Sequence, residues 1–168
     1  AFILYEKTQK EVLRVFNMLE YELGNELFEK TFPIILTDNG TEFGDPLSLE
    51  FNNEGVGRTR IFYCNPRASY QKGMIEKNHE FIRYVLPKGT SFDSLLQTDI
   101  DLMMNHINSY SRATLGDRCP IEVFEQLYWK SILKKLDVKR VNPNDIVLHW
   151  RQDWTGKNNV QVDSIVWY

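Results

Sequence analysis

The chain of 168 residues is long enough for one domain with its own core, and with 42% hydrophobic, 13% aromatic and 26% charged residues its composition is that of an ordinary globular protein. No segment has the length and apolarity of a membrane span, and no basic-then-apolar stretch opens the chain, so we expect a cytoplasmic protein without a membrane partner. Taken alone, the net charge of −3 argues against a protein that binds nucleic acid.

A strand and a helix are predicted first. Residues 1–5 are apolar and prone to β-structure, and because a chain rarely begins inside a strand, we expect coding sequence to be missing upstream of them. Thr8 or Gln9 opens the helix and Gly24 ends it. The apolar side chains of this helix recur at helical spacing at Val12, Val15, Phe16 and Leu19.

Two strands, with a polar turn and a short helix between them, are predicted next. The apolar and β-branched residues 32–37 indicate a buried strand, and the Asp-Asn-Gly sequence at 38–40 indicates a turn at its end. A short helix around 46–53 and a second strand at 60–64 follow. Residues 65–73 contain several residues that break regular structure, so they are predicted to form a loop.

Helices dominate the centre of the sequence. One helix is predicted at 74–85, where Pro87 stops it, and the next runs from a cap at Thr90 or Ser91 to about residue 108. The apolar stripe of this second helix is predicted to face the core. It consists of Leu96, Ile100, Met103 and Ile107.

The C-terminal part is predicted to contain two short helices and two weak strands. Pro120 suits the first turn of a helix that runs to about residue 127, and a further helix is predicted to end at Leu136. The weak strands are predicted at 146–150 and 160–166. The alternation of strands and helices along the chain predicts an α/β domain.

The two cysteines, Cys64 and Cys119, are far apart in the sequence and form no closely spaced pair. We therefore expect two reduced, partly buried thiols. The three histidines stand at no ligand-like spacing from the cysteines, so a zinc site is not expected.

Charge is unevenly distributed along the chain. Residues 20–50 contain eight acidic residues and one lysine, whereas residues 55–90 contain seven basic residues and two acidic ones. A second basic cluster lies between residues 130 and 140. Two interpretations remain open: a solvated charged face, or a basic surface that follows phosphates beside an acidic metal site. The seven basic residues are Arg58, Arg60, Arg67, Lys72, Lys77, Arg83 and Lys88.

Asp38 and Glu76 are the two carboxylates whose positions suit metal chemistry. Asp38 ends a predicted strand, and Glu76 lies thirty-eight positions later in the first turn of a predicted helix. Each feature alone has an ordinary explanation, a turn for Asp38 and compensation of the helix dipole for Glu76. Together, a carboxylate at a strand end and one on a nearby helix can converge on hard divalent cations, which prefer oxygen ligands and promote phosphoryl transfer in pairs.

The helix that carries Glu76 has two distinct faces. The face predicted to pack inward carries Ile75, Ile82, Val85 and Leu86. A second face carries Glu76, His79, Glu80 and Arg83. Arg83 suits a phosphate because its guanidinium is planar, although a surface ion pair is the alternative. We expect His79 to be a polar or DNA-facing residue and not a metal ligand.

Several blocks of sequence resemble one family. Residues 36–43, Leu-Thr-Asp-Asn-Gly-Thr-Glu-Phe, resemble the block around the second aspartate of the Asp-Asp-Glu transposases and retroviral integrases. Residues 65–76 resemble the flexible loop and third carboxylate of those enzymes. Residues 76–93 and 105–124 are similar to bacterial insertion-sequence transposases of the number-thirty family. The resemblance covers roughly residues 1–145.

The resemblance implies a ribonuclease-H-like α/β fold, in which helices flank a mixed five-stranded sheet. It implies a polynucleotidyl transferase that uses Mg²⁺ or Mn²⁺, with two ions in the complete enzyme, to nick transposon ends and join the freed 3′-hydroxyl to target DNA. Double-stranded DNA would be the partner, and the complete protein would be a homo-oligomer. Asp38 would be the second catalytic aspartate and Glu76 the catalytic glutamate, both as metal ligands. Contacts to the DNA backbone are assigned to Lys72, Arg83, Arg67 and Lys77.

The chain departs from the family pattern at both ends. The first aspartate of the family lies on the first strand, some tens of residues before the second, so we expect that strand and its carboxylate to be missing here. Residues 1–127 are therefore predicted to be a partial catalytic core, and residues 128–168 a C-terminal extension of helix and weak strands, whose tail from residue 149 matches nothing in the family. We expect this chain alone to be inactive. The alternatives are a remnant that binds DNA or a transposase subunit without catalysis, and a nuclease of the same fold that cuts without joining.

Overall fold

A computed structural model describes residues 1–65, 73–149 and 164–166, and for 73–77 and 164–166 it describes the backbone alone. Contacts divide the chain into two compact units. Unit 1 consists of residues 1–5 and 76–168, and unit 2 of residues 6–75. Among the described residues, no helix is both long enough and apolar enough to cross a membrane.

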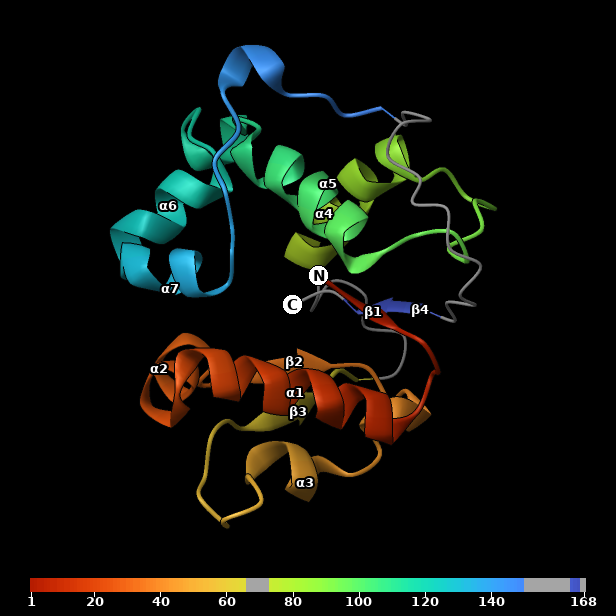
Figure 1. The fold of residues 1–168 in the computed structure, drawn as a ribbon, viewed down its shortest axis with the longest axis vertical. Helices are drawn as coiled ribbons and strands as arrows, with labels where there is room; N and C mark the ends of the chain where they lie inside the picture. Colours follow the sequence, from red (N-terminus) through yellow and green to blue (C-terminus); the bar gives the residue numbers. More distant parts are fainter. Residues whose placement is uncertain (66–72, 150–163, 167–168) are drawn as a thin grey trace. The chain divides into compact units, whose positions relative to one another are not determined.

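Unit 2 is organised around α1 (Gln9–Leu23), which begins and ends where the sequence predicts (Figure 1). The hydroxyl of Thr8 accepts a hydrogen bond from the Glu11 amide at 3.3 Å, as a helix N-cap does. Gly24 ends the helix with φ +80°, a conformation that favours glycine. The buried side chains of α1 include the predicted set of Val12, Val15, Phe16 and Leu19.

A second helix, α2 (Asn25–Thr31), follows at once and was not predicted. The sequence gives no separate signal for it because Gly24 serves both as the end of α1 and as the cap of α2. Phe28 of α2 is buried and packs against Phe16, with ring centroids 6.1 Å apart. Tertiary packing of this ring therefore holds a helix that local propensity alone leaves undecided.

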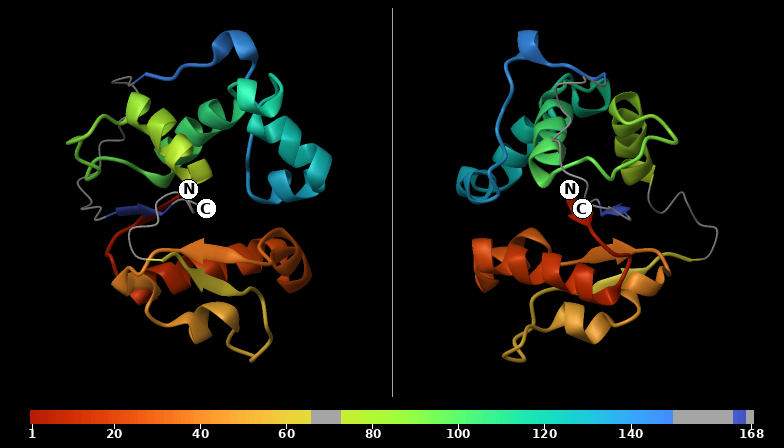
Figure 2. Two further views of the ribbon diagram at one scale, coloured as in Figure 1. Left: turned by 180° about the vertical axis from the view of Figure 1, so that it is seen from behind. Right: turned by 45° about the vertical axis from the view of Figure 1, so that its right-hand side comes forward.

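The strands of unit 2, β2 (Ile35–Thr37) and β3 (Ile61–Tyr63), pair in parallel with Ile35 opposite Ile61. The prediction of a buried strand at 32–37 is wrong in part, because β2 is shorter and Leu36 is exposed. Alternate side chains of a strand face opposite sides, and helices cover one side of this pair in the views of Figures 1 and 2. In the described part of the chain, β2 pairs with β3 only.

Between these strands lies α3 (Pro46–Glu50), three residues shorter than the predicted helix. Asp45 caps it, since its carboxylate accepts hydrogen bonds from the amide and hydroxyl of Ser48. The helix stops early because Asn52 turns the chain: its side-chain oxygen accepts from the amides of Glu54 and Val56 at 3.0 and 2.9 Å.

Arg58 is fully buried in unit 2, so neither of the two open interpretations, a solvated charged face or a surface that follows phosphates, applies to it. Its guanidinium donates to the carbonyls of Leu49 and Ser48 at 2.9 Å each, and to side chains of α1. Those side chains are Asn17 and Glu20, each at 2.8 Å. The charge therefore contributes to the core of the unit and is not available to a phosphate.

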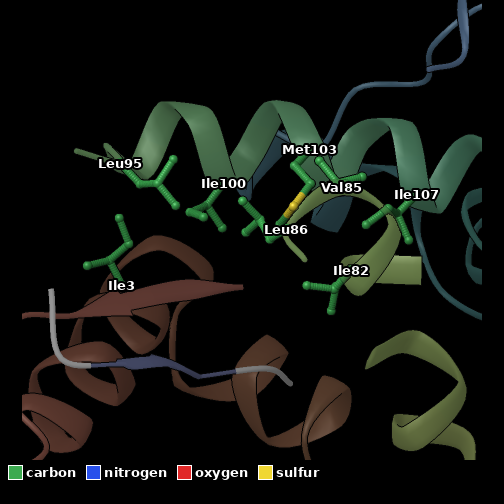
Figure 3. Close-up of a cluster of buried hydrophobic side chains, with 8 residues drawn as sticks. All are labelled: Ile3, Ile82, Val85, Leu86, Leu95, Ile100, Met103 and Ile107. Carbon is green, nitrogen blue, oxygen red and sulfur yellow. The ribbon is translucent and has the colours of Figure 1, made fainter. Parts of the chain in front are cut away.

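Unit 1 contains the antiparallel pair of β1 (Phe2–Leu4) with β4 (Ser164–Val166), and the helices α4 to α7. Helix α4 (Gly73–Val85) begins at the last residues of unit 2, and α5 (Gln97–Ser109) packs against β1. Figure 3 shows the core cluster that joins these three elements. It consists of Ile3, Ile82, Val85, Leu86, Leu95, Ile100, Met103 and Ile107.

One predicted boundary and one predicted strand in unit 1 are wrong. Helix α5 begins at Gln97 and not near Ser91, because the Ser91 hydroxyl is engaged with Asp93 in a local turn. The carboxylate of Asp99 instead accepts from the Leu96 amide at 2.8 Å at the start of the helix. The described residues of the predicted strand at 146–150 have no strand structure, and the Val147 amide donates to His106 Nδ1 at 3.1 Å instead.

The last helices agree with the sequence. Helix α6 (Pro120–Leu127) has its proline in the first turn, and α7 (Lys130–Lys135) ends before Leu136. Of the second weak strand, residues 164–166 form β4. The described strands form two separate pairs, so the mixed five-stranded sheet and the division at residue 127 stay predictions.

Candidate functional site

Asp38 is exposed at the carboxyl end of β2, where the sequence places it. Its Oδ1 accepts a hydrogen bond from the Gly40 amide at 3.3 Å, which is the geometry of an Asx turn. Because the strand ends immediately before it, the carboxylate lies at the edge of the parallel pair. Ligand-binding groups of parallel sheets commonly occupy this edge.

The turn that carries Asp38 is fixed to the neighbouring strand by two hydrogen bonds. The Asn39 side-chain amide donates to the Cys64 carbonyl at 3.2 Å, and the Cys64 amide donates to the Thr37 carbonyl at 2.8 Å. Cys64 is buried and forms no disulfide, and the same is true of Cys119, as expected for reduced thiols. The position of the Asp38 backbone thus depends on the ends of both strands.

Glu42 lies directly behind the turn, and sequence reasoning did not single it out. It is buried, and its Oε1 pairs with Lys7 Nζ at 3.4 Å. A Cβ added at Gly40 would lie 2.5 Å from Glu42 Oε2, so the glycine gives this carboxylate its room. The pattern Asp-Asn-Gly-Thr-Glu therefore encodes a turn packed on its own glutamate.

Tyr63 closes the same region from β3, since its hydroxyl donates to the Phe43 carbonyl. Burial raises the pKa of this hydroxyl, and the carboxylates of Glu50 and Asp45 raise it further. The phenol therefore stays protonated at neutral pH and can act as a hydrogen-bond donor. Its role here is to hold the segment after Asp38.

Glu76 occupies the first turn of α4, as predicted, but its side chain and that of Lys77 are outside the described part of the structure. The predicted DNA contacts Arg67 and Lys72 also lie outside the described residues. Because Asp38 belongs to unit 2 and Glu76 to unit 1, their convergence on one metal site stays a prediction. In the part of the chain with described side chains, no three His, Cys, Asp or Glu residues gather in a metal-binding cluster.

The inward face predicted for α4 is confirmed where its side chains are described. Ile82, Val85 and Leu86 are buried in the cluster of Figure 3. On the second predicted face, Glu80 and Arg83 are exposed, whereas His79 is half-buried and its Nε2 is buried. Arg83 is therefore open to solvent, as a residue that contacts DNA must be.

Arg112, which belongs to the block 105–124 that resembles the family, fixes α4 from outside the helix. One of its nitrogens, Nη1, donates to Asn78 Oδ1 at 2.7 Å, and its guanidinium carbon lies 4.8 Å from the centre of the Phe81 ring. Both partners belong to α4, within five residues of Glu76. Burial lowers the pKa of the guanidinium, and Cys119 opposes the shift. Arg112 thus holds the helix that presents the predicted catalytic glutamate.

Comparison with known proteins gives several related sequences. The transposase of insertion sequence element IS1086 from Cupriavidus metallidurans is 31% identical over 68 residues, which is 40% of this chain and 20% of the relative. Transposase InsI of element IS30A from Escherichia coli is 30% identical over 89 residues, 53% of this chain and 22% of the relative. The ORF3 protein of Spiroplasma virus SpV1-R8A2 B, provisionally named an integrase, is 32% identical over 126 residues, 75% of this chain and 37% of the relative.

The aligned part of this chain spans about a fifth to just over a third of the length of these relatives. No protein family model matches the chain, and no solved structure matches it. The similarities nevertheless agree with the resemblance drawn from residues 36–43 and 76–93. This chain is related to insertion-sequence transposases, and those of the IS30 elements are among its relatives.

Proposed function

We propose that this chain forms part of the catalytic core of a DNA transposase with a ribonuclease-H-like fold. The observation that carries the proposal is the position of Asp38, an exposed carboxylate at the end of a parallel strand on a turn fixed by Asn39. The relatives named as transposases support the same function. DNA would be the substrate, which would place the activity in the cytoplasm of a bacterial host.

The residues fit a hard divalent cation. An exposed carboxylate at a strand end supplies the oxygen ligand that Mg²⁺ or Mn²⁺ prefers, and such ions take only one or two carboxylates besides phosphate and water. Asp38 and Glu76 would hold the ions. A bound pair of ions would supply activation of an attacking oxygen and stabilisation of the leaving oxygen.

The remaining residues of the chain would bind and orient DNA. Arg83 is exposed and would hold a phosphate through its planar guanidinium. Lys72, Arg67 and Lys77 are proposed to extend this contact along the backbone. Asn39 and Glu42 would hold the turn of Asp38 still, so that its carboxylate needs little reorganisation on binding. The reaction would be nicking of transposon ends by water, followed by joining of the 3′-hydroxyl to target DNA, within a homo-oligomer.

The test is a nicking and strand-joining assay with the protein expressed from its complete reading frame. Asp38→Asn and Glu76→Gln each remove a metal ligand at constant size, so we expect each to lower the rate by about a thousandfold. Glu29→Gln, an exposed carboxylate on α2, is the matched control and should leave the rate unchanged. Full activity in either ligand variant would refute the proposal. DNA binding without any nicking by the unaltered protein would identify a non-catalytic remnant instead.

A further inference from the structure

A cavity of about 330 Å³ lies in unit 1 beside the second half of α4. That volume is at the lower end of the range for small-molecule sites, about 300–1000 Å³. Its walls come from α4 and from the turn that follows the helix, so a single short stretch of sequence builds it. The lining residues are His79, Ile82, Arg83, Leu86, Pro87, Lys88, Gly89, Thr90 and Phe92.

The turn after α4 brings a lysine to the cavity. The Thr90 amide donates to the Pro87 carbonyl at 3.0 Å, which closes a four-residue turn. Gly89, the third residue of this turn, has φ +91°, the conformation that a type II turn requires at that position. Lys88 is consequently the exposed second residue of a rigid turn. A substitution at Gly89 would be strained and would move this lysine.

The rim of the cavity is positively charged. Arg83 and Lys88 are both exposed, and neither forms an ion pair with any residue that the structure describes. The lining contains no carboxylate that could neutralise them. Two exposed cations among the lining residues of one small cavity, with no carboxylate beside them there, favour an anionic ligand, and a phosphate accepts hydrogen bonds from both a guanidinium and an ammonium.

The floor of the cavity is apolar. Ile82 and Leu86 are 7% and 5% exposed, and their side chains belong to the core cluster of unit 1. Phe92 is half-buried and packs on the same cluster. A phosphate alone would gain nothing from contact with these apolar side chains. A ligand with both a phosphate and a flat aromatic group would use the rim and the floor together.

We propose that this cavity binds one unpaired nucleotide of a DNA end, with its phosphate between Arg83 and Lys88 and its base over Phe92. The inference rests on the proposed function, because it takes DNA to be the substrate. It adds a site that selects frayed or single-stranded ends over intact duplex. A base still stacked in a duplex could not reach the floor, whereas an unpaired base can enter with little loss of stacking and pairing energy.

Binding of labelled DNA to the purified 168-residue chain tests the site, with fluorescence anisotropy measured in EDTA so that no metal contributes. The three probes are a blunt duplex, the same duplex with three unpaired nucleotides at one end, and the latter with abasic sites in place of the unpaired bases. Stacking on an aromatic side chain contributes enough that we expect the frayed end to bind about tenfold tighter than the blunt one. The abasic probe should lose this advantage.

Substitutions separate the phosphate contact from the base contact. Arg83→Ala and Lys88→Ala should each raise the Kd of the frayed probe by about five- to tenfold. Each should also lower the slope of log Kd against log salt concentration by about one. Phe92→Leu keeps an apolar side chain in the core, so it should abolish the preference for the frayed end while leaving the salt dependence unchanged. Lys30→Ala removes one exposed positive charge from α2 and serves as the charge control.

A base analogue gives a direct readout. 2-Aminopurine at the unpaired position should be quenched on binding, and Phe92→Leu should relieve the quenching. Equal affinity for blunt and frayed ends, or no change in 2-aminopurine emission, would overturn the proposal, as would the absence of DNA binding. None of these results depends on Asp38, Glu76 or metal, so the nicking assay of the complete protein would still judge the proposed function separately.

Discussion

Each unit of the molecule contains an arginine against aromatic rings, and the two differ in how far their hydrogen bonds are satisfied. Arg58 of unit 2 is 0% exposed, lies over Phe16 and Phe28, and has four acceptors at 2.8–2.9 Å. Arg112 of unit 1 lies over Phe81 and donates to Asn78. Its Nε and Nη2 atoms are buried without a hydrogen-bond partner among the described residues.

This difference shows that residue type alone does not tell whether an arginine belongs to a core or to a contact between elements. A buried charge is stable only where partners replace its water, and Arg58 has a carboxylate, an amide and two carbonyls for that purpose. Arg112 is less completely satisfied, which suits a residue that positions α4 and not one that builds a core. We therefore expect the same substitution to have very different effects in the two units.

Arg58→Met is expected to have the largest effect. The methionine would fill much of the space but leave Glu20 Oε2 and the carbonyl of Leu49 without the Arg58 donor, at a cost of about 3–5 kcal/mol in the free energy of unfolding. Peptide-resolved hydrogen exchange would show the loss of protection in α1 and α3. Tryptophan fluorescence follows unit 1 only, since all four tryptophans lie between residues 129 and 167.

Arg60→Met is the matched control for Arg58. Its guanidinium is largely exposed and lies 3.8 Å from Glu50, so the expected change is within about 0.5 kcal/mol. If both variants unfolded alike, position in the chain and not burial would decide the cost. If neither did, the claim that Arg58 supports the core of unit 2 would be wrong.

Glu20, the ion-pair partner of Arg58, makes the stability of unit 2 depend on pH. Burial raises its pKa, but hydrogen bonds from Asn52, Asn25 and Arg58 outweigh burial and leave the pKa below its ordinary value. A carboxyl with a lowered folded pKa contributes stability above its unfolded pKa of about 4.3, and this stability is lost as pH falls through the folded pKa. Urea unfolding followed by exchange in α1 should therefore show unit 2 weakening below about pH 4.5.

Glu20→Gln separates this contribution from other acidic groups. The variant should lose about 1.5–3 kcal/mol at pH 7, because charged hydrogen bonds to Arg58 and two asparagines become neutral or vanish. Its stability should then fall less steeply with acid than that of the unaltered chain. If the stability of the variant fell as steeply with decreasing pH as that of the unaltered chain, the pH dependence would belong to other carboxyls, such as Asp45.

Thr8→Ala tests a smaller contribution to the stability of unit 2, the N-cap of α1. The Thr8 hydroxyl accepts from the Glu11 amide, and loss of such a cap costs about 1 kcal/mol. Asp99→Ala is the corresponding change in unit 1, where the carboxylate accepts from the Leu96 amide. Exchange in the first turns of α1 and α5 should increase in the respective variant alone. Loss of protection in both helices from either change would contradict separate stability of the two units.

The caps and stops of helices were the part of the fold that the sequence could predict. Thr8, Gly24, Pro87 and Pro120 act through their own chemistry within a few residues, so a local reading suffices for them. Helix α2 was not predicted because Phe28 fixes it through tertiary contacts with Phe16. The start of α5 was misplaced because Ser91 can cap a turn as well as a helix.

The candidate site was predictable only as far as motifs extend. Asp38 at a strand end and Glu76 in a first helical turn follow from pattern, and the structure places each backbone accordingly. Glu42 lies inside the motif at 36–43, but its packing behind Gly40 was not singled out. The contact of Arg112 with Asn78 was not predictable, because the two residues lie 34 positions apart in the chain. The burial of Arg58 was not predictable either, since its partners on α1 lie about forty residues earlier in the chain.

Arg112→Met should have the smallest effect on stability. The change loses one hydrogen bond to Asn78 and the contact with Phe81, but it also removes two buried donors that lack described partners. These terms nearly cancel, so tryptophan-detected unfolding should shift by less than about 1 kcal/mol in either direction. A loss as large as that of Arg58→Met would mean that the buried donors have acceptors, and the contrast between the two arginines would fail. With unchanged stability and faster exchange confined to α4, Arg112 would be a positioning residue for the helix of Glu76.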